Sequence, residues 1–208
     1  MAIIALAGNK GGTGKTTLCV NLATALAMRD SVALIDADPQ QSSYQWGGIA
    51  GDIEGLSVLN GSRRLASVID DAKAAHTHVM IDCPPSARAS QTAAALAVAD
   101  AVLIPVQPSP LDLWATLGIE DQIHGARLGN PGLRALVVIN QMEPRTKLSQ
   151  VMRAALGELA IDAAETTIRR RVIYRTTLME GRSLAATGKA GEPARAELHQ
   201  LIDEVLTP

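Results

Sequence analysis

The feature that most constrains this chain is a glycine-rich stretch, GNKGGTGKTT, at residues 8–17. It lies between a short apolar run at residues 2–8, AIIALAG, and a longer helical pattern at residues 15–29. A strand, a glycine-rich turn and a helix in this order direct backbone N–H groups and the positive end of the helix toward one point. That arrangement binds phosphate, so the pattern predicts a nucleotide-phosphate loop.

The loop departs from the usual spacing in one respect. The common pattern G-x-x-x-x-G-K-[ST] requires a glycine at position 9, but Asn9 is there, and a second lysine, Lys10, follows it. Lys15 is expected to supply a charge for the β- and γ-phosphates, and the Thr16 hydroxyl to ligate Mg²⁺. The residues expected to surround the nucleotide are Gly11, Gly12, Thr13, Gly14, Lys15, Thr16 and Thr17.

Short apolar runs alternate with longer helical patterns along the rest of the chain. The runs are rich in Val and Ile, as in strands that are buried on both faces. We therefore predict an α/β fold with a mostly parallel central sheet flanked by helices, in one domain over residues 1–208. The expected further strands are residues 31–39, 78–85, 100–108 and 134–141, and the expected further helices include residues 62–75, 87–99 and 192–206.

Acidic side chains end two of these predicted strands. Asp36 and Asp38 close the run ALIDADP, and Asp82 closes VMID. Ligands of open α/β sheets bind at the carboxyl ends of the strands, where these acids would repel each other unless a cation lay among them. We expect Asp82 to hold Mg²⁺ directly or through water, Asp36 to support the metal from further away, and Asp38 to orient the attacking water. Taken alone, each acid could also be a helix cap or a turn residue.

Composition narrows the setting. The net charge is −2, so DNA binding would need a local patch. Cys19 and Cys83 are the only cysteines and form no C-x-x-C pattern, which favours a reducing cytoplasm. The sequence has no signal-peptide pattern and no apolar run long enough to cross a membrane, so we expect neither a leader nor a membrane span. The four histidines have no ligand spacing, and His76 and His78 are expected at the surface.

The stretches KGGTGKTT, DADPQ and IDCPP together resemble the deviant-Walker ATPases of the ParA/MinD superfamily. The resemblance implies ATP and Mg²⁺ as cofactors and an ATP-dependent homodimer. It also implies that Lys10 reaches the partner's nucleotide, so that Lys10, Lys15 and Asp38 form the catalytic set. Asn140 would then help to recognise adenine, although it could instead be a residue of a turn at the strand end.

Within the superfamily, the chain is most similar to the small ParF-like partition ATPases. The stretch PVQPSPLDLWA at residues 105–115 resembles their proline-rich segment, and the phosphate loop begins with no helix-turn-helix before it. The resemblance implies non-specific DNA binding, partition of DNA or positioning of another cargo, and a ParB-like or other adaptor that stimulates hydrolysis. The protein would be cytoplasmic and associated with the nucleoid, without a membrane partner.

A basic segment near the C-terminus is the candidate DNA surface. It carries Arg169, Arg170, Arg171, Arg175 and Arg182. Phosphate-backbone contacts need only such positive charge. In an extended segment, Arg170 would point to the opposite side from its two neighbours. The alternative is that these arginines are solvated or paired with acids.

Three other readings stay open. A MinD-like ATPase would act on membrane, but the polar side of residues 192–206 is acidic. A metabolic ATP-dependent ligase or carboxylase of the same fold would not need Lys10. An iron–sulfur ATPase would need paired cysteines at a dimer axis, and Cys19 and Cys83 are in the wrong places for that.

Overall fold

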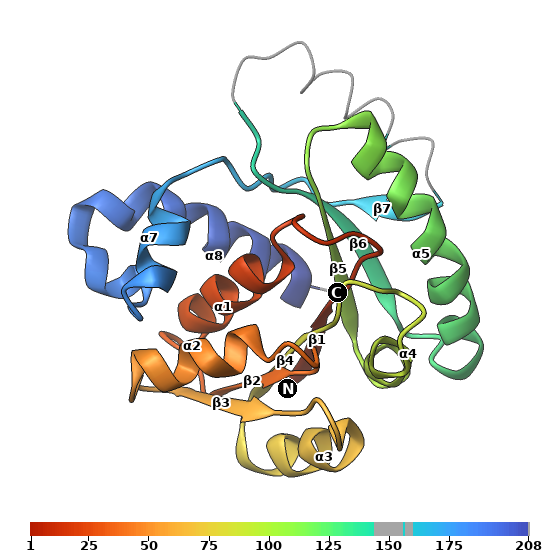
Figure 1. Cartoon of the computed structure of the whole chain (residues 1–208), viewed down its shortest axis with the longest axis horizontal. Coiled ribbons are helices and arrows are strands. Elements are labelled where there is room, and N and C mark those ends of the chain that lie inside the picture. The colour runs from red at the N-terminus through yellow and green to blue at the C-terminus, as the bar shows by residue number, and fades with distance from the viewer. Residues whose placement is uncertain (144–155, 157–159, 208) are drawn as a thin grey trace.

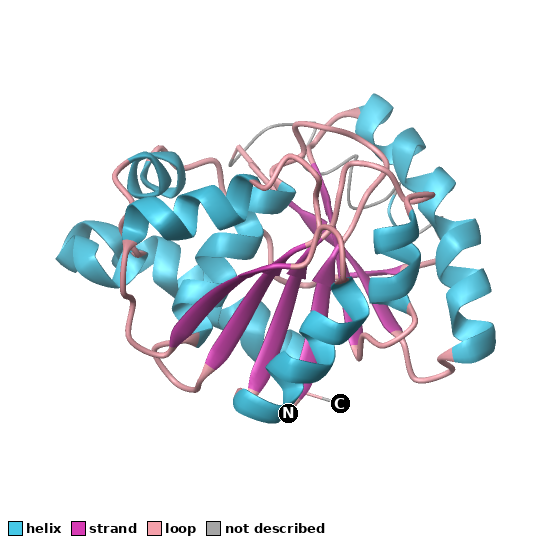
Figure 2. Cartoon of the chain, turned by 60° about the horizontal axis from the view of Figure 1, so that its bottom comes forward, coloured by secondary structure: helices cyan, strands magenta, loops and turns pink. Residues whose placement is uncertain are grey.

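The protein is built around one parallel sheet of seven strands. The computed structural model describes residues 1–143, 156 and 160–207, and for residues 110–117 only the course of the helix. The strand order is β3-β2-β4-β1-β5-β6-β7, and all neighbouring strands of the sheet pair in parallel (Figures 1 and 2). The strands are β1 Ala2–Leu6, β2 Val32–Asp36, β3 Leu56–Asn60, β4 His78–Asp82, β5 Ala101–Val106, β6 Arg134–Ile139 and β7 Asp162–Ala163.

Helices cover both faces of the sheet. On one face lie α1 Lys15–Leu26, α2 Ser42–Ala50, α7 Ile173–Met179, the 3₁₀ segment η1 Leu184–Gly191 and α8 Glu192–Leu206. On the other face lie α3 Leu65–Ala75, α4 Ser90–Leu96 and α5 Pro110–Gly129. Within the described part of the chain, no helix has the length and apolarity that crossing a membrane requires.

The central strands are apolar throughout because both of their faces are buried. In β1, Ile3 packs in the layer with α3, α4 and α5, whereas its neighbour Ile4 packs in the layer with α1 and α8. Both side chains are 3% exposed. The predicted α/β class with a central parallel sheet is therefore confirmed, and the expected strands correspond to β1, β2, β4, β5 and β6.

Several elements at the margins were not predicted. Strand β3 is an edge strand of half-buried residues, and β7 has only two residues. Helix α2 is nine residues long and contains Gly47 and Gly48, which are poor helix formers. Pattern reading fails here because the signal of a short or partly buried element is weak.

The expectation that His78 lies at the surface was wrong, whereas His76 is partly exposed. His78 begins the central strand β4, is 7% exposed and lies 3.5 Å from the carboxylate of Asp30. The ring of His76 is part-buried and bonds the Ser57 hydroxyl at 3.0 Å. Both cysteines are buried and free, as their spacing suggested.

Candidate nucleotide-binding site

The glycine-rich loop joins β1 to α1 at the carboxyl edge of the sheet. Its last glycine, Gly14, directly precedes the helix and has φ 89°. A Cβ atom at this position would lie 2.6 Å from Nδ2 of Asn140. Backbone conformation and close packing therefore both require glycine there.

Side chains from two neighbouring strand ends hold the loop. Asn140, which follows β6 and is 6% exposed, donates from Nδ2 to the carbonyl of Thr13 at 2.8 Å. Gln107, which follows β5, donates from Nε2 to the carbonyl of Gly12 at 2.6 Å. Asn140 was predicted to contact adenine, whereas its recorded contacts position the loop. The role of Gln107 was not predicted, although Gln107 directly follows a buried strand, which is the same pattern that identified the acidic residues.

The two lysines of the loop occupy different environments. Lys15 is 6% exposed, and its amine donates to the carbonyl of Lys10 at 2.9 Å. Burial lowers the pKa of Lys15, while the carboxylates of Asp82 and Asp38 act in the opposite direction. The side chain of Lys10 is exposed at the rim of the loop. Lys15 is thus buried in the site, whereas Lys10 is exposed to solvent.

Asp82 is a deeply buried acid at the end of β4. It is 1% exposed, and neither carboxylate oxygen has a hydrogen-bond partner among the residues that the structure describes. Burial raises the pKa of this carboxyl to about 7; the nearby Thr16 hydroxyl lowers it and Asp36 adds repulsion. A buried carboxylate without partners is costly unless it is protonated or bound to a cation. Asp82 and Thr16 therefore fit a divalent cation that takes most of its ligands from phosphate and water.

Asp36 has a different local task. It is fully buried and lies opposite Asp82 in the β2–β4 pairing. Its Oδ1 accepts the backbone N–H of Asp38 at 3.0 Å, and its Oδ2 accepts that of Tyr44 at 2.8 Å. Asp36 thereby fixes the turn that carries Asp38 to the phosphate loop. No cluster of three or more His, Cys, Asp or Glu side chains suited to a metal occurs in residues 1–143, 156 and 160–207.

Asn9, the residue that breaks the usual loop pattern, connects three segments. Its Oδ1 accepts the backbone N–H of Ala87 at 2.9 Å, in the loop after β4. A Cβ atom at Gly118 of α5 would lie 2.4 Å from its Nδ2, so the helix leaves room for this amide. A glycine at position 9 could make neither contact, and no local sequence pattern indicated this linking role.

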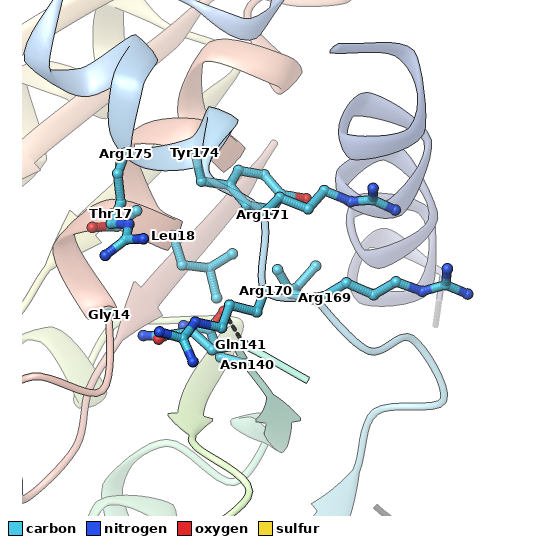
Figure 3. A pocket seen from close by; sticks show the side chains of 11 residues that line it. Gly14, Thr17, Leu18, Asn140, Gln141, Arg169, Arg170, Arg171, Tyr174 and Arg175 are labelled. Atoms are coloured by element: carbon cyan, nitrogen blue, oxygen red, sulfur yellow. Dashed lines mark hydrogen bonds between the residues drawn. The ribbon is translucent and has the colours of Figure 1, made fainter. Parts of the chain in front are cut away.

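Two cavities meet at the loop. The first is lined by Gly11, Gly12, Gly14, Lys15, Thr16, Thr17, Asp38, Cys83, Pro85, Gln107, Gln141 and Arg175. The second, shown in Figure 3, is lined by Gly14, Thr17, Leu18, Asn140, Gln141, Ile168, Arg169, Arg170, Arg171, Tyr174 and Arg175. The first brings most of the expected phosphate-binding residues together with Asp38, but its lining does not include Lys10. The second offers an apolar wall beside Asn140.

The five predicted DNA-binding arginines do not form one uniform surface. Arg169 and Arg171 point toward α8, where both contact Glu197, while Arg170 and Arg175 point to the opposite side (Figure 3). Arg170 pairs with Glu143 at 2.7 Å, and Arg182 pairs with Glu180 at 3.3 Å. The expected alternation of Arg170 with its neighbours is confirmed, and the alternative of pairing with acids applies to four of the five.

Glu197 is the anchor of this segment on α8. Its carboxylate, 12% exposed, accepts hydrogen bonds from Nη2 of Arg171 at 2.5 Å, the Tyr174 hydroxyl at 3.1 Å and the backbone N–H of Arg169 at 3.2 Å. The hydrogen bond to Glu197 raises the pKa of Arg171, and burial raises the pKa of Tyr174. One carboxylate thus attaches the whole turn to the helix.

We expect Glu197→Ala to lower the free energy of unfolding by about 1–3 kcal/mol, because it leaves several partly buried donors without an acceptor. The matched control is Asp203→Ala on the same helix, which removes an exposed pair with Arg29 and should cost about 0–1 kcal/mol. Denaturant titration measures both. Equal losses in the two variants would show that Glu197 is an ordinary surface acid.

Comparisons with known proteins agree with this geometry. A family model described as "CobQ/CobB/MinD/ParA nucleotide binding domain" matches residues 4–184. The protein "Maintenance of carboxysome distribution protein A" of Halothiobacillus neapolitanus is 36% identical over 206 residues, covering 98% of this chain and 95% of that protein.

Two solved structures have similar folds. Apo McdA of Cyanothece superimposes with a TM-score of 0.77 at 19% identity, covering 97% of this chain and 99% of its own. The septum site-determining protein MinD of Pyrococcus horikoshii, solved with Mg-ADP, gives 0.73 at 22% identity, covering 99% and 97%. At these identities the likeness concerns the fold.

Proposed function

This chain belongs to the CobQ/CobB/MinD/ParA family of nucleotide-binding proteins and is an ATPase of the ParA/MinD type, and we propose that it positions a cargo by switching with ATP. In this proposal a monomer binds Mg-ATP, two ATP-bound monomers associate, and the dimer binds DNA non-specifically. An adaptor protein stimulates hydrolysis and so returns the monomer. The protein would work in the cytoplasm, on the nucleoid.

The observation that carries the proposal is the pair of lysines with opposite surroundings. Lys15 lies inside the loop, where it can serve its own nucleotide, and Lys10 lies exposed at the rim. An exposed cation at the rim can approach the phosphates of a second protomer. At about 4 Å and an effective dielectric constant near 20, such a pair of unit charges interacts by about 4 kcal/mol. Dimerisation would therefore depend on the bound nucleotide.

The remaining residues of the site would have separate roles in ATP hydrolysis. Mg²⁺ would be held by Thr16 and Asp82 and would neutralise charge on the phosphates. Asp38, held in its turn by Asp36, lines the same cavity as Lys15 and would orient the attacking water. The Thr16 hydroxyl at the start of α1 and the Asp82 carboxylate at the end of β4, which would receive the metal, interact with each other in the structure.

The relative from Halothiobacillus neapolitanus is the basis on which we propose a kind of cargo. It is named for the maintenance of carboxysome distribution, and it aligns along nearly the whole of this chain. We therefore favour positioning of a large protein assembly such as a carboxysome over partition of a plasmid. Fluorescence imaging of such assemblies after deletion of the gene should show clusters where the parent strain shows even spacing, and unchanged spacing would oppose this choice.

Gel shifts on unrelated DNA fragments test the DNA-binding step. We expect binding with ATP and little binding with ADP or without nucleotide. If roughly 4–6 phosphates are neutralised, the logarithm of the binding constant should fall against the logarithm of the salt concentration with a slope of about −4 to −5. Arg169→Ala and Arg182→Ala should each weaken binding and reduce the slope by about 1. Their guanidinium groups are about half exposed, so their acidic partners compete only weakly with DNA phosphate.

The control for this assay is ATP-dependent dimerisation of the same two variants, which should be unchanged. ATP-dependent co-sedimentation with anionic liposomes, without any DNA binding, would instead favour the MinD-like alternative.

A further inference from the structure

Four residues lie at the junction of the two cavities of the site. Gly14, Thr17, Gln141 and Arg175 line both of them. On one side of the junction are the groups suited to phosphates, among them Lys15. On the other side are the apolar side chains of Leu18, Ile168 and Tyr174, which suit a base.

A nucleotide that occupies both cavities must cross this junction. With its terminal phosphates beside Lys15 and its base beside Asn140, the part at the junction is the ribose and the α-phosphate. Thr17 follows the metal-binding hydroxyl at the start of α1, where backbone N–H groups already favour an anion. In such an arrangement, one negative charge of the ligand would lie close to Thr17.

Arg175 is the only charged residue among the four. Its side chain extends from α7 toward Thr17 and Gly14, away from α8 (Figure 3). Among the described residues no acid pairs with it, in contrast to Arg169, Arg170 and Arg171. An unpaired guanidinium beside an expected phosphate is well suited to a charge-assisted hydrogen bond.

The position of Arg175 is also fixed by its neighbour. Tyr174 is 7% exposed, and its hydroxyl bonds the carbonyl of Ala194 and the carboxylate of Glu197, each at 3.1 Å. These bonds attach the start of α7 to α8, so Arg175 is presented toward the junction by a rigid support.

We propose that Arg175 binds the α-phosphate of the nucleotide held by its own protomer and is not part of the DNA surface. This inference rests on the proposed nucleotide site and deepens it. ATP and ADP share the α-phosphate, so Arg175 should contribute equally to both. It differs in this from Lys10, whose contribution would require ATP and a second protomer.

Calorimetric titration with Mg-ADP, a non-hydrolysable Mg-ATP analogue and adenosine tests the proposal. Arg175→Ala should weaken the binding of ADP and of the ATP analogue by a similar factor, about tenfold, while the affinity for adenosine stays unchanged. Arg175→Lys should recover part of the loss, because it keeps the charge without the planar fork. Arg182→Ala, three residues beyond the end of α7 and outside the lining of both cavities, should bind all three ligands as the wild type does.

The outcomes separate this inference from the proposed function. Wild-type ADP affinity in Arg175→Ala overturns the inference alone, as does a loss of adenosine binding equal to the loss of ADP binding. Loss of DNA binding by Arg175→Ala at saturating ATP, with ADP affinity intact, would assign the residue to DNA and overturn it too. A wild-type protein that binds no nucleotide would overturn the proposed site itself. Thermal unfolding of each variant checks that the fold is retained.

Discussion

Lys15→Ala should abolish nucleotide binding, with affinity for ADP reduced by about 100-fold or more, whereas Lys10→Ala should leave ADP binding nearly intact. The reason is the different burial of the two amines. Lys15 is 6% exposed and lines the cavity that the phosphates would occupy, whereas Lys10 is an exposed residue of the same loop. Calorimetry with Mg-ADP measures the first property, and size-exclusion chromatography with ATP measures the dimer, which Lys10→Ala should remove.

Gly11→Val provides a second test of the dimer without touching a charge. A Cβ atom at Gly11 would meet no heavy atom within 4 Å, so the larger side chain fits the monomer and obstructs only an approaching partner. The matched control is Gly12→Val, where φ is 84° and a side chain is strained within the monomer itself. We expect Gly11→Val to retain ADP binding and lose the dimer, and Gly12→Val to lose both.

Equal loss of ADP affinity in Lys10→Ala and Lys15→Ala would refute the role of Lys10 in the partner's site.

The sequence was informative wherever burial is complete. The strands β1, β2, β4 and β5 are buried on both faces, so their apolar runs were unambiguous. Complete burial of these strands also allowed the positions of the acidic residues to be predicted, because a polar residue that ends such an apolar run must lie at the carboxyl edge of the sheet. Asp36 and Asp82 are indeed opposite each other in the β2–β4 pairing.

Contacts between distant segments could not be read in the same way. The bond from Asn9 to Ala87 spans 78 residues and that from Gln107 to Gly12 spans 95. Neither has a local pattern, because each depends on which loops the sheet brings together. The arginine segment is the clearest case. Its charge suggested one basic surface, whereas a single acid on α8, Glu197, binds two of its five arginines.

Asp38→Ala should retain Mg-ATP binding and dimerisation while hydrolysis falls by about 100-fold or more, the range for loss of a positioned acid–base group. Asp38 is not needed to hold the metal, because Asp82 and Thr16 remain. Its turn also survives, since Asp36 bonds the backbone N–H of residue 38 and not its side chain. The ATP-bound dimer should therefore persist, which chromatography with ATP and a phosphate-release assay together measure.

Asp38→Asn is the control that separates charge from position. In the structure Oδ1 of Asp38 accepts the backbone N–H of Gln40 at 2.9 Å, and an asparagine oxygen can keep this bond while losing the negative charge. If Asp38 acts on the attacking water through its charge, both variants lose hydrolysis; if it acts only by shaping the turn, Asp38→Asn stays active. A wild-type basal rate of ATP hydrolysis of about 1 s⁻¹, as in kinases, would contradict the proposal that hydrolysis is slow until an adaptor protein stimulates it. Failure of Asp38→Ala to bind ATP would move this carboxylate from hydrolysis to nucleotide binding.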